Sequence, residues 1–374
     1  MIRRFARIPT VVLFALGMTA IAWSATAAES KDELRKQAYD TSLPVGKRMD
    51  AVRELTGKKF DGSKTYRICV WDMFGKVGPI YAAAKEQQAT ITAYGLKTEM
   101  IPHTSESVMV EELKAGTCDA ALMSGLRARL FNEYTGTLDA IGGLYDLDQV
   151  RLAHKLLADP RSADKMVENG YVIMGIAGGT AAYIFVNDRS INTLQAAAGK
   201  RVAVLDYDPV QSEMIAGIGA TPVVTDIVNA PNMFNNGVVD VLAAPLAGYE
   251  VLELYKGMSP NGGIIDLPLT YVSLQLVGHE SIFPNELAQL IREAFYSNFD
   301  AMLARIFAEE EKVPEKWWIE IPAEDRVRYE KRMQEARLVL RDEKNYYDPE
   351  MLTLLRKIRC RSDASRPECT NPVE

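Results

Sequence analysis

The sequence predicts an α/β protein built from two similar lobes, with long helices in its C-terminal part. Two observations predict this fold. The order strand, helix, strand, helix, strand occurs twice along the chain, and this order is typical of parallel sheets with right-handed crossovers. Later, from Asn285 onward, apolar residues recur with helical spacing.

The first lobe is predicted from five segments that follow a charged, mostly helical lead-in over 31–59. Gly95 and Gly116 end the two helices, and Thr104 or Ser105 is the expected cap of the second one. The segments are a strand over 66–71, a helix over 79–94, a strand over 98–101, a helix between its cap and Gly116, and a strand over 119–123. Strands in the order 2-1-3 would leave a crevice beyond the carboxyl end of the first strand.

The second lobe repeats this pattern down to single residues. Gly116 lies three residues before Asp119, and Gly237 lies three residues before Asp240. Helix-glycine-strand junctions look alike in many α/β proteins, but agreement in both element order and junction favours two similar lobes. The segments are a strand over 201–205, a helix over 210–216, a strand over 221–224, a helix over 233–236 and a strand over 239–243.

Two further apolar strands and three helical regions complete the prediction. The strands, over 183–186 and 272–277, stand where one lobe must connect to the other. Asp348 and Pro349 are the expected cap and first residue of the last helix. The predicted boundaries are lobe I over 28–185 with a return segment at about 268–300, lobe II over 186–267, and C-terminal helices over 284–374 that pack across the lobes.

Residues 1–27 have the pattern of a secretory signal peptide. Three arginines precede an apolar run over 11–23, and Ala25, Thr26 and Ala27 supply small residues at the cleavage site. The alternative is a retained membrane anchor, but the run is shorter than the ~20 residues that a spanning helix needs. The mature chain is expected to begin at Ala28 or Glu29, without a cysteine for lipid attachment.

The mature chain is expected to be an acidic, soluble protein outside the cytoplasm. Removal of the three leader arginines changes the formal net charge from -7 to -10. Such a charge disfavours binding to nucleic acid or to an anionic membrane surface.

Four cysteines in an exported chain indicate disulfides. Cys360 and Cys369 enclose a short loop and are expected to pair. Cys69 and Cys118 lie on or beside strands that are neighbours in the 2-1-3 order, although strand positions rarely give ideal disulfide geometry.

A ligand is expected between the lobes, at the loops that follow the strands. Glycines in the loop over 71–78 would let the backbone approach a ligand, and the helix start near Pro79 would offer free N–H groups. The candidate ligand contacts are Trp71, Asp72, Phe74, Gly75, Arg127, Arg129, Asn132, Asp206, Tyr207 and Tyr249.

Each of these residues also has a structural interpretation. Trp71 is equally typical of a core, and Asp72 of a hydrogen-bonded turn. Arg127 and Arg129 are two residues apart, so on a helix only one of them would face the crevice. Tyr207 and Tyr249 are the weakest candidates.

The order of several longer segments resembles that of the periplasmic solute-binding proteins of TRAP transporters. Over about 60–300 the likeness rests on "LDAIGGLYDLDQVRLAHKLL", "ENGYVIMGIAGGTAAYIFVND", "INTLQAAAGKRVAV" and "GATPVVTDIVNAPNMFNNGVVDVLAAP". The segments "CVWDMFGKVGPIY" and "AGTCDAALMSGLRARLFNEYTGTLDAIGGL" resemble the AdeT-like solute-binding proteins more closely. The resemblance implies the type II-like, TRAP solute-receptor architecture. It also implies a protein that captures a small polar or anionic solute for a membrane transporter.

One position departs from the TRAP pattern. TRAP proteins carry an arginine in a "GxKxRV" strand that pairs with the substrate carboxylate, whereas Ala203 occupies that place here. Arg201 lies two residues earlier, farther from the carboxyl end of the strand. Either another arginine such as Arg127 takes the role, or the ligand is not an organic acid.

Other functions have less support in the sequence. The three histidines show no metal-ligand spacing, no serine or cysteine lies in a nucleophile motif, and "GIAGGT" leads into a strand instead of a helix. An enzyme, a cofactor and a metal are therefore not expected. An efflux accessory would need a long heptad hairpin, for which the helix over 324–340 is short. A ligand-free interaction scaffold remains an alternative.

Overall fold

The computed structural model describes residues 30–57 and 59–374, so the predicted signal peptide lies outside the described residues. The chain begins there with a helix over 30–39, followed by α2 (Val45–Leu55). Arg48 of α2 pairs with Glu293 of α11 (Asn285–Ser297), with 2.6 Å between Nη1 and Oε2. None of the helices in the described ranges has the length and apolar character needed to cross a membrane.

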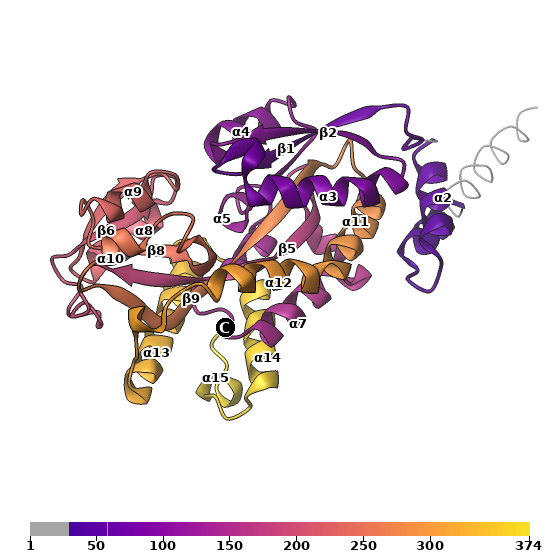
Figure 1. Ribbon diagram of the computed structural model, residues 1–374. Helices are drawn as coiled ribbons and strands as arrows, with labels where there is room; N and C mark the ends of the chain where they lie inside the picture. The colour runs from indigo at the N-terminus through magenta and orange to yellow at the C-terminus, as the bar shows by residue number, and fades with distance from the viewer. Residues whose placement is uncertain (1–29, 58) are drawn as a thin grey trace, which may run out of the picture.

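One mixed sheet of ten strands runs through both halves of the molecule (Figure 1). Its order is β2-β1-β3-β9-β5-β8-β6-β7, while β10 pairs with β9 and β4 pairs with β5. We call the half that contains β1 to β3 lobe I, and the half that contains β6 to β8 lobe II. The strands are β1 (Thr65–Trp71), β2 (Lys97–His103), β3 (Ala120–Ser124), β4 (Val167–Glu168), β5 (Tyr171–Val186), β6 (Arg201–Leu205), β7 (Thr221–Thr225), β8 (Val241–Pro245), β9 (Gly263–His279) and β10 (Trp318–Ile319).

Both lobes contain the predicted parallel units. In lobe I, β1 pairs in parallel with β2 and with β3, which confirms the order 2-1-3. In lobe II, β6 pairs in parallel with β7 and β8. The helices are α3 (Pro79–Ala93), α4 (Glu106–Lys114), α5 (Gly125–Ala128), α6 (Glu133–Gly136), α7 (Leu147–Ala158), α8 (Pro209–Gly217), α9 (Ala230–Asn235), α10 (Tyr255–Met258), α11 (Asn285–Ser297), α12 (Phe299–Glu310), α13 (Ala323–Asp342), α14 (Pro349–Ser362) and α15 (Pro367–Thr370).

The two connecting strands, β5 and β9, are much longer than predicted. They pair antiparallel with each other, with register shifts, and extend from one lobe into the other (Figure 1). One shift lies between Ala177 and Thr180. There a Cβ on Gly179 would lie 2.1 Å from the carbonyl oxygen of Val272, so glycine permits the close backbone approach. Because β5 and β9 belong to both halves, the boundaries of the lobes stay a prediction.

The repeated glycine and aspartate have the same role in each lobe. The carboxylate of Asp119 accepts a hydrogen bond from the backbone N–H of Arg67 at 2.7 Å, and the guanidinium of Arg67 donates to the carbonyl of Gly116 at 2.7 Å. In lobe II, Asp240 accepts from the backbone N–H of Arg201 at 2.8 Å, and Arg201 donates to the carbonyl of Gly237 at 2.9 Å. The sequence echo thus reflects one junction built twice.

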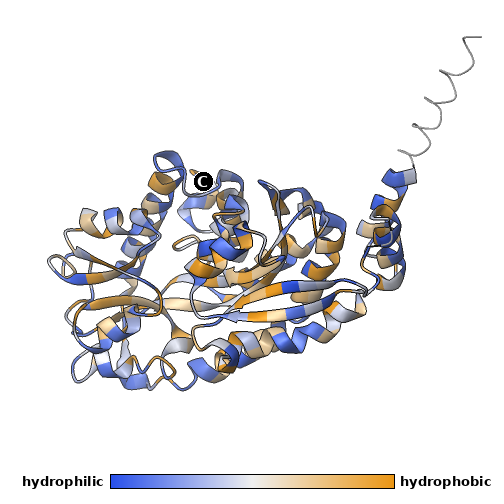
Figure 2. Cartoon of the chain, turned by 90° about the horizontal axis from the view of Figure 1, so that it is seen from above, coloured by the Kyte–Doolittle hydropathy of each residue, from blue (hydrophilic) through white to orange (hydrophobic). Residues whose placement is uncertain are grey.

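Apolar side chains cover both faces of the sheet in lobe I. Ile68 and Val70 face one buried cluster, which includes Leu287 and Ile291 of α11. Cys69 faces the other cluster, to which the C-terminal helix α14 contributes. This alternation follows from the two-residue period of a strand. Figure 2 accordingly shows orange segments along the central strands and blue segments on outer helices and loops.

The C-terminal helices contact both halves. On the lobe II side, Arg326 of α13 donates to the carbonyl of Asp266 at 2.7 Å. On the lobe I side, the core cluster of β1 and β3 includes Leu352 and Leu355 of α14. Asp348 caps α14 as predicted, because its carboxylate accepts from the backbone N–H of Met351.

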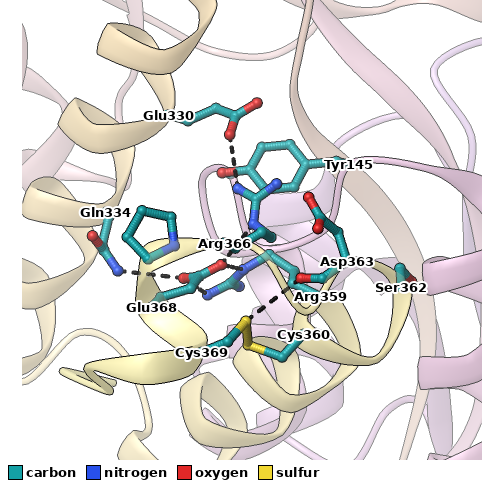
Figure 3. Close-up of polar contacts among 12 residues, drawn as sticks. Tyr145, Glu330, Gln334, Arg359, Cys360, Ser362, Asp363, Arg366, Glu368 and Cys369 are labelled. Atoms are coloured by element: carbon teal, nitrogen blue, oxygen red, sulfur yellow. Dashed lines mark hydrogen bonds and ion pairs between the residues drawn. A yellow bond between two sulfur atoms is a disulfide. The ribbon is translucent and has the colours of Figure 1, made fainter.

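A buried charged cluster holds the end of the chain (Figure 3). Arg359 is fully buried and donates to both carboxylate oxygens of Glu368 at 2.7 Å, and to Glu374 at 2.5 Å. Its Nη1 donates to the carbonyl of Gly143 at 2.8 Å. Cys360 and Cys369 form a disulfide beside this cluster. Cys69 and Cys118 form a second disulfide in lobe I, so both predicted pairs are confirmed.

Candidate functional site

The loop after β1 contains a helix cap. Asp72 is buried, and its carboxylate accepts hydrogen bonds from the backbone N–H groups of Phe74, Ile80 and Tyr81 at 2.9, 2.8 and 3.0 Å. A Cβ on Gly78 would lie 1.8 Å from Oδ1 of Asp72, so glycine is needed to make room for the cap. The prediction of free N–H groups at the start of α3 is therefore wrong, and Gly78 accommodates a side chain instead of a ligand.

Trp71, the last residue of β1, lies in the core, while its contact with a ligand stays a prediction. Its side chain belongs to a buried apolar cluster, yet its Nε1 is buried without a hydrogen-bond partner. The neighbouring Phe74 is 38% exposed, and Gly75 is buried with a left-handed φ of 60°. Of this loop, only Trp71 offers a buried polar group that a ligand could use.

Arg127, on α5, connects the lobes. Its guanidinium carbon lies 3.5 Å from the ring centroid of Tyr207, which follows β6 in lobe II. Such stacking is a cation–π contact. The guanidinium also lies 4.0 Å from a carboxylate oxygen of Glu106 and 3.9 Å from one of Asp206. Arg127 therefore has acidic neighbours of its own, although its Nε is buried without a hydrogen bond.

Arg129, one residue beyond α5, has a different environment. Its guanidinium carbon lies 3.8 Å from the ring centroid of Tyr346 and 5.1 Å from that of Tyr347. Nη2 donates to the carbonyl of Gly136 at 2.9 Å. Nε and Nη1 are buried without a hydrogen-bond partner, and within the described ranges Arg129 forms no ion pair. These two nitrogens are donors that a ligand could use.

Both arginines thus meet aromatic rings from distant parts of the chain, and which of them faces a ligand stays a prediction. The hydroxyl of Tyr346 donates to Asp208 of lobe II at 2.5 Å, next to Tyr207. The helix α5 is only four residues long, and each long side chain reaches its own ring. The hydroxyl of Tyr207 is buried without a partner, and burial raises the pKa of this tyrosine.

Polar groups from η2 (Thr137–Asp139), from α6 and from β9 lie beside α5. Oδ2 of Asp139 accepts from the backbone N–H of Ser273 at 3.0 Å, whereas Oδ1 has no partner. Gln275 donates to the carbonyl of Thr135 at 2.9 Å, while its own Oε1 and the hydroxyl of Thr135 have no partner. A Cβ on Gly125 would lie 2.3 Å from Oδ2 of Asp139, which places these groups against the start of α5.

Asp139 differs from an ordinary surface carboxylate. Burial raises its pKa to about 7, while the hydrogen bonds from Ser273 and the charge of Arg129 lower the pKa in part. A substantial fraction of Asp139 is therefore protonated near neutral pH.

We name these side chains the interlobe polar cluster. Its members share a buried polar atom that has no hydrogen-bond partner. They are Trp71, Arg127, Arg129, Thr135, Asp139, Tyr207 and Gln275.

The other predicted contacts have structural partners or lie exposed. Asn132 caps α6 and donates to the carbonyl of Lys165 at 3.0 Å. Tyr249 lies in the apolar core of lobe II, where its hydroxyl accepts from Nε1 of Trp317 at 2.8 Å. The side chain of Asp206 is 48% exposed beside Arg127.

Sequence reasoning missed Thr135, Asp139, Gln275 and Tyr346. Thr135 and Asp139 stand in the quoted segment after β3, where "EYTGTLDA" marks a turn-rich stretch. Gln275 and Ser273 interrupt the apolar run over 272–277 of β9, and such polar exceptions were the available signal. Tyr346 had none, because it lies far along the chain.

Comparison with known sequences shows the family of this chain. The family described as "Solute-binding protein AdeT 1/2" matches residues 89–374. The chain belongs to this AdeT 1/2 family. It is 38% identical over 300 residues to "Probable solute-binding protein AdeT1" of Acinetobacter baumannii, covering 80% of this chain and 98% of that protein. It is 24% identical to "Probable solute-binding protein AdeT2" of the same organism over 235 residues, covering 63% of this chain and 98% of that protein.

Solved structures share the fold of this AdeT 1/2 chain. A TRAP periplasmic solute-binding protein from Desulfovibrio salexigens with bound orotic acid matches with a TM-score of 0.64 and 16% identity, over 79% of this chain and 99% of that one. One from Xanthobacter autotrophicus Py2 with bound β-D-galacturonate has a TM-score of 0.59 and 16% identity, over the same shares of 79% and 99%. One from Sulfurospirillum deleyianum with bound succinate has a TM-score of 0.57 and 16% identity, over 79% and 98%. The architecture is that of TRAP solute receptors.

The departure at Ala203 stands out in this AdeT 1/2 chain. Ala203 lies in β6, and its methyl side chain cannot pair with a carboxylate. Arg201 cannot replace it, because its guanidinium pairs with Asp240, with 2.7 Å between Nη2 and Oδ1. Of the two arginines that face the rings, Arg129 is the one without a carboxylate partner.

Proposed function

We propose that this protein binds a small anionic or polar solute between its lobes, outside the cytoplasm, and presents it to a membrane transporter. Arg129 carries the proposal. Its side chain is half-buried, its Nε and Nη1 are buried without hydrogen-bond partners, and among the described residues no carboxylate oxygen lies within ion-pair distance. An anion bound there would satisfy both the charge and the donors.

The surrounding groups complete a binding site. The interlobe polar cluster adds the Trp71 N–H and the hydroxyls of Thr135 and Tyr207 as donors, and Oε1 of Gln275 as an acceptor. These groups suit a solute with an acidic group and further polar atoms. The bound orotate, galacturonate and succinate of the fold relatives have this chemistry.

The proposed partner is a membrane transporter, and the proposed location is outside the cytoplasm. A solute held between two lobes is released by a hinge motion, which a transporter in the membrane would exploit. The alternatives are an accessory role in efflux and a ligand-free scaffold, and neither gives the unpaired donors a role.

A thermal-shift screen tests the solute. We expect at least one organic carboxylate to stabilise the protein, by ~2.7 kcal/mol at a hundredfold excess over Kd. The screen uses uronates, orotate, succinate and other mono- and dicarboxylates, with neutral sugars as matched controls. Native mass spectrometry of the purified protein identifies any solute that is already bound. Equal responses to the acids and the neutral sugars would contradict anion recognition.

The affinity for an anion is expected to fall as pH rises through about 7. With a pKa raised to about 7, Asp139 is about nine-tenths protonated at pH 6 and about one-tenth at pH 8. Ionised Asp139 repels an anion and has no donor to offer. An anion that requires the protonated form therefore binds about tenfold more weakly at pH 8, as measured by calorimetry.

The variant Asp139→Asn is the control for this pH dependence. Its amide oxygen can still accept from the backbone N–H of Ser273, but it does not titrate. The variant should bind equally well at both pH values. The stability of the fold should change with pH in the same direction. Because the pKa of Asp139 is higher in the folded than in the unfolded chain, its contribution to stability is full below the unfolded pKa and is lost as pH rises through about 7. A pH dependence that survives in Asp139→Asn would assign it to another group.

A further inference from the structure

A second group of polar side chains lies within lobe I, around the Cys69–Cys118 disulfide. Two other metal-ligating side chains, His103 and Glu112, converge on this pair. One ligand atom of each of the four residues lies within 4.8 Å of the others. The disulfide is fully buried, with Cys69 on β1 and Cys118 just before β3. His103 ends β2, and Glu112 lies on α4.

The imidazole of His103 is unsatisfied at this place. Its Nε2 is buried, makes no hydrogen bond and lies 3.4 Å from a carboxylate oxygen of Glu112. The same oxygen of Glu112 lies 3.8 Å from Sγ of Cys118. The free ring nitrogen thus faces the carboxylate and the sulfurs, as a metal ligand would.

The donor set points to zinc. Two thiolates, an imidazole and a carboxylate are ligands that Zn²⁺ accepts in a tetrahedral site, with Zn–S at about 2.3 Å and Zn–N at about 2.0 Å. A cysteine binds zinc as a thiolate, which a disulfide does not provide, so the disulfide form offers only two of the four ligands. In the described ranges, this is the one group of at least three such residues whose ligand atoms converge.

We propose that reduction of Cys69–Cys118 creates a four-coordinate zinc site with His103 and Glu112, so that the disulfide gates metal binding. A dithiol reductant supplies two electrons and two protons, which break the S–S bond and leave two thiols, while the dithiol becomes a disulfide. Zn²⁺ then binds both sulfurs and displaces their two protons. His103 and Glu112 supply the remaining two ligands.

The test compares oxidised and reduced full-length protein. Each form is incubated with Zn²⁺ and desalted, the reduced one after anaerobic treatment with a phosphine, and zinc per chain is measured by plasma mass spectrometry. We expect one zinc per reduced chain and none per oxidised chain. Co²⁺ in place of zinc should show thiolate-to-metal charge transfer and the visible bands of a tetrahedral site only after reduction.

Variants locate the site. His103→Ala and Glu112→Gln should each weaken zinc binding by at least about tenfold, since even second-shell changes have effects of this size. Glu112 is one-third exposed, so its variant should fold even if loss of His103 disturbs the core. The double variant Cys360→Ser, Cys369→Ser should retain zinc. The proposal is overturned if the reduced protein does not bind one zinc per chain, whether or not it stays folded. It is also overturned if both ligand variants bind as wild type does, or if zinc requires Cys360 and Cys369.

Discussion

Replacement of Arg359 by alanine is expected to lower the free energy of unfolding by about 3–5 kcal/mol. Arg359 is fully buried and hydrogen-bonded to the carboxylate of Glu368 (Figure 3). It also donates to the carboxylate of Glu374. Removal of the cation would leave both carboxylates buried with fewer compensating charges, and uncompensated buried charge is the costly case. The substitution would also free the carbonyl of Gly143.

The loss of stability in acid should depend on the same contacts. Burial raises the pKa of Glu368, but hydrogen bonds and charge from Arg359 and Arg366 outweigh this effect and lower the pKa to about 2. A carboxylate with a lowered pKa stabilises the fold above its unfolded pKa, and this contribution is lost as pH falls toward 2. The acid sensitivity of wild type between about pH 4.5 and 2 should therefore be smaller in Arg359→Ala.

Urea unfolding followed by circular dichroism measures the loss. Arg361→Ala is the matched control, because Arg361 is an exposed arginine on the same helix and should change stability by less than ~0.5 kcal/mol. A loss for Arg359→Ala no larger than that of the control would show that the cluster is not stabilising. A loss confined to the disulfide-reduced protein would assign the effect to Cys360–Cys369 instead.

The sequence predicted the parallel units well, because local signals specify them. The caps Ser105 and Asp348 lie where their residue types indicate. The extents of β5 and β9 could not be predicted in the same way. Glycines and register shifts interrupt their apolar pattern, and their length follows from pairing with each other across the lobes, which no local window contains.

The candidate site was predicted only in part for a similar reason. Strand ends indicated Trp71, Arg127, Arg129 and Tyr207 as candidates, and the structure places Arg127 against the ring of Tyr207. The alternative interpretation of Asp72, a hydrogen-bonded turn, is confirmed, because its carboxylate accepts from backbone N–H groups. The sequence could not show that Tyr346 stacks on Arg129. Such contacts join segments that only the folded chain brings together, and the four groups around Cys69 likewise come from separate elements.

Replacement of Arg129 by methionine is expected to weaken binding of the solute by at least about 30-fold, equivalent to about 2 kcal/mol. Methionine keeps much of the apolar stem, which lies beside Gly136, but removes the guanidinium that stacks on Tyr346, with its charge and its two unpaired nitrogens. If an anion pairs with Arg129, it then lies buried without its cation. Isothermal titration calorimetry with the solute found in the screen measures the change.

Arg127→Met is the matched comparison, because both arginines stack on a tyrosine and, in the described ranges, only Arg127 has carboxylate oxygens at ion-pair distance. We expect it to weaken binding less than Arg129→Met, since part of its charge is already compensated. Arg129→Lys should recover some affinity, as it keeps the charge but loses the planar donors. Thermal unfolding without solute serves as the folding check. If Arg129→Met folds normally and binds as tightly as wild type, the solute binds elsewhere, whereas a larger loss in Arg127→Met would move the anion contact to that residue.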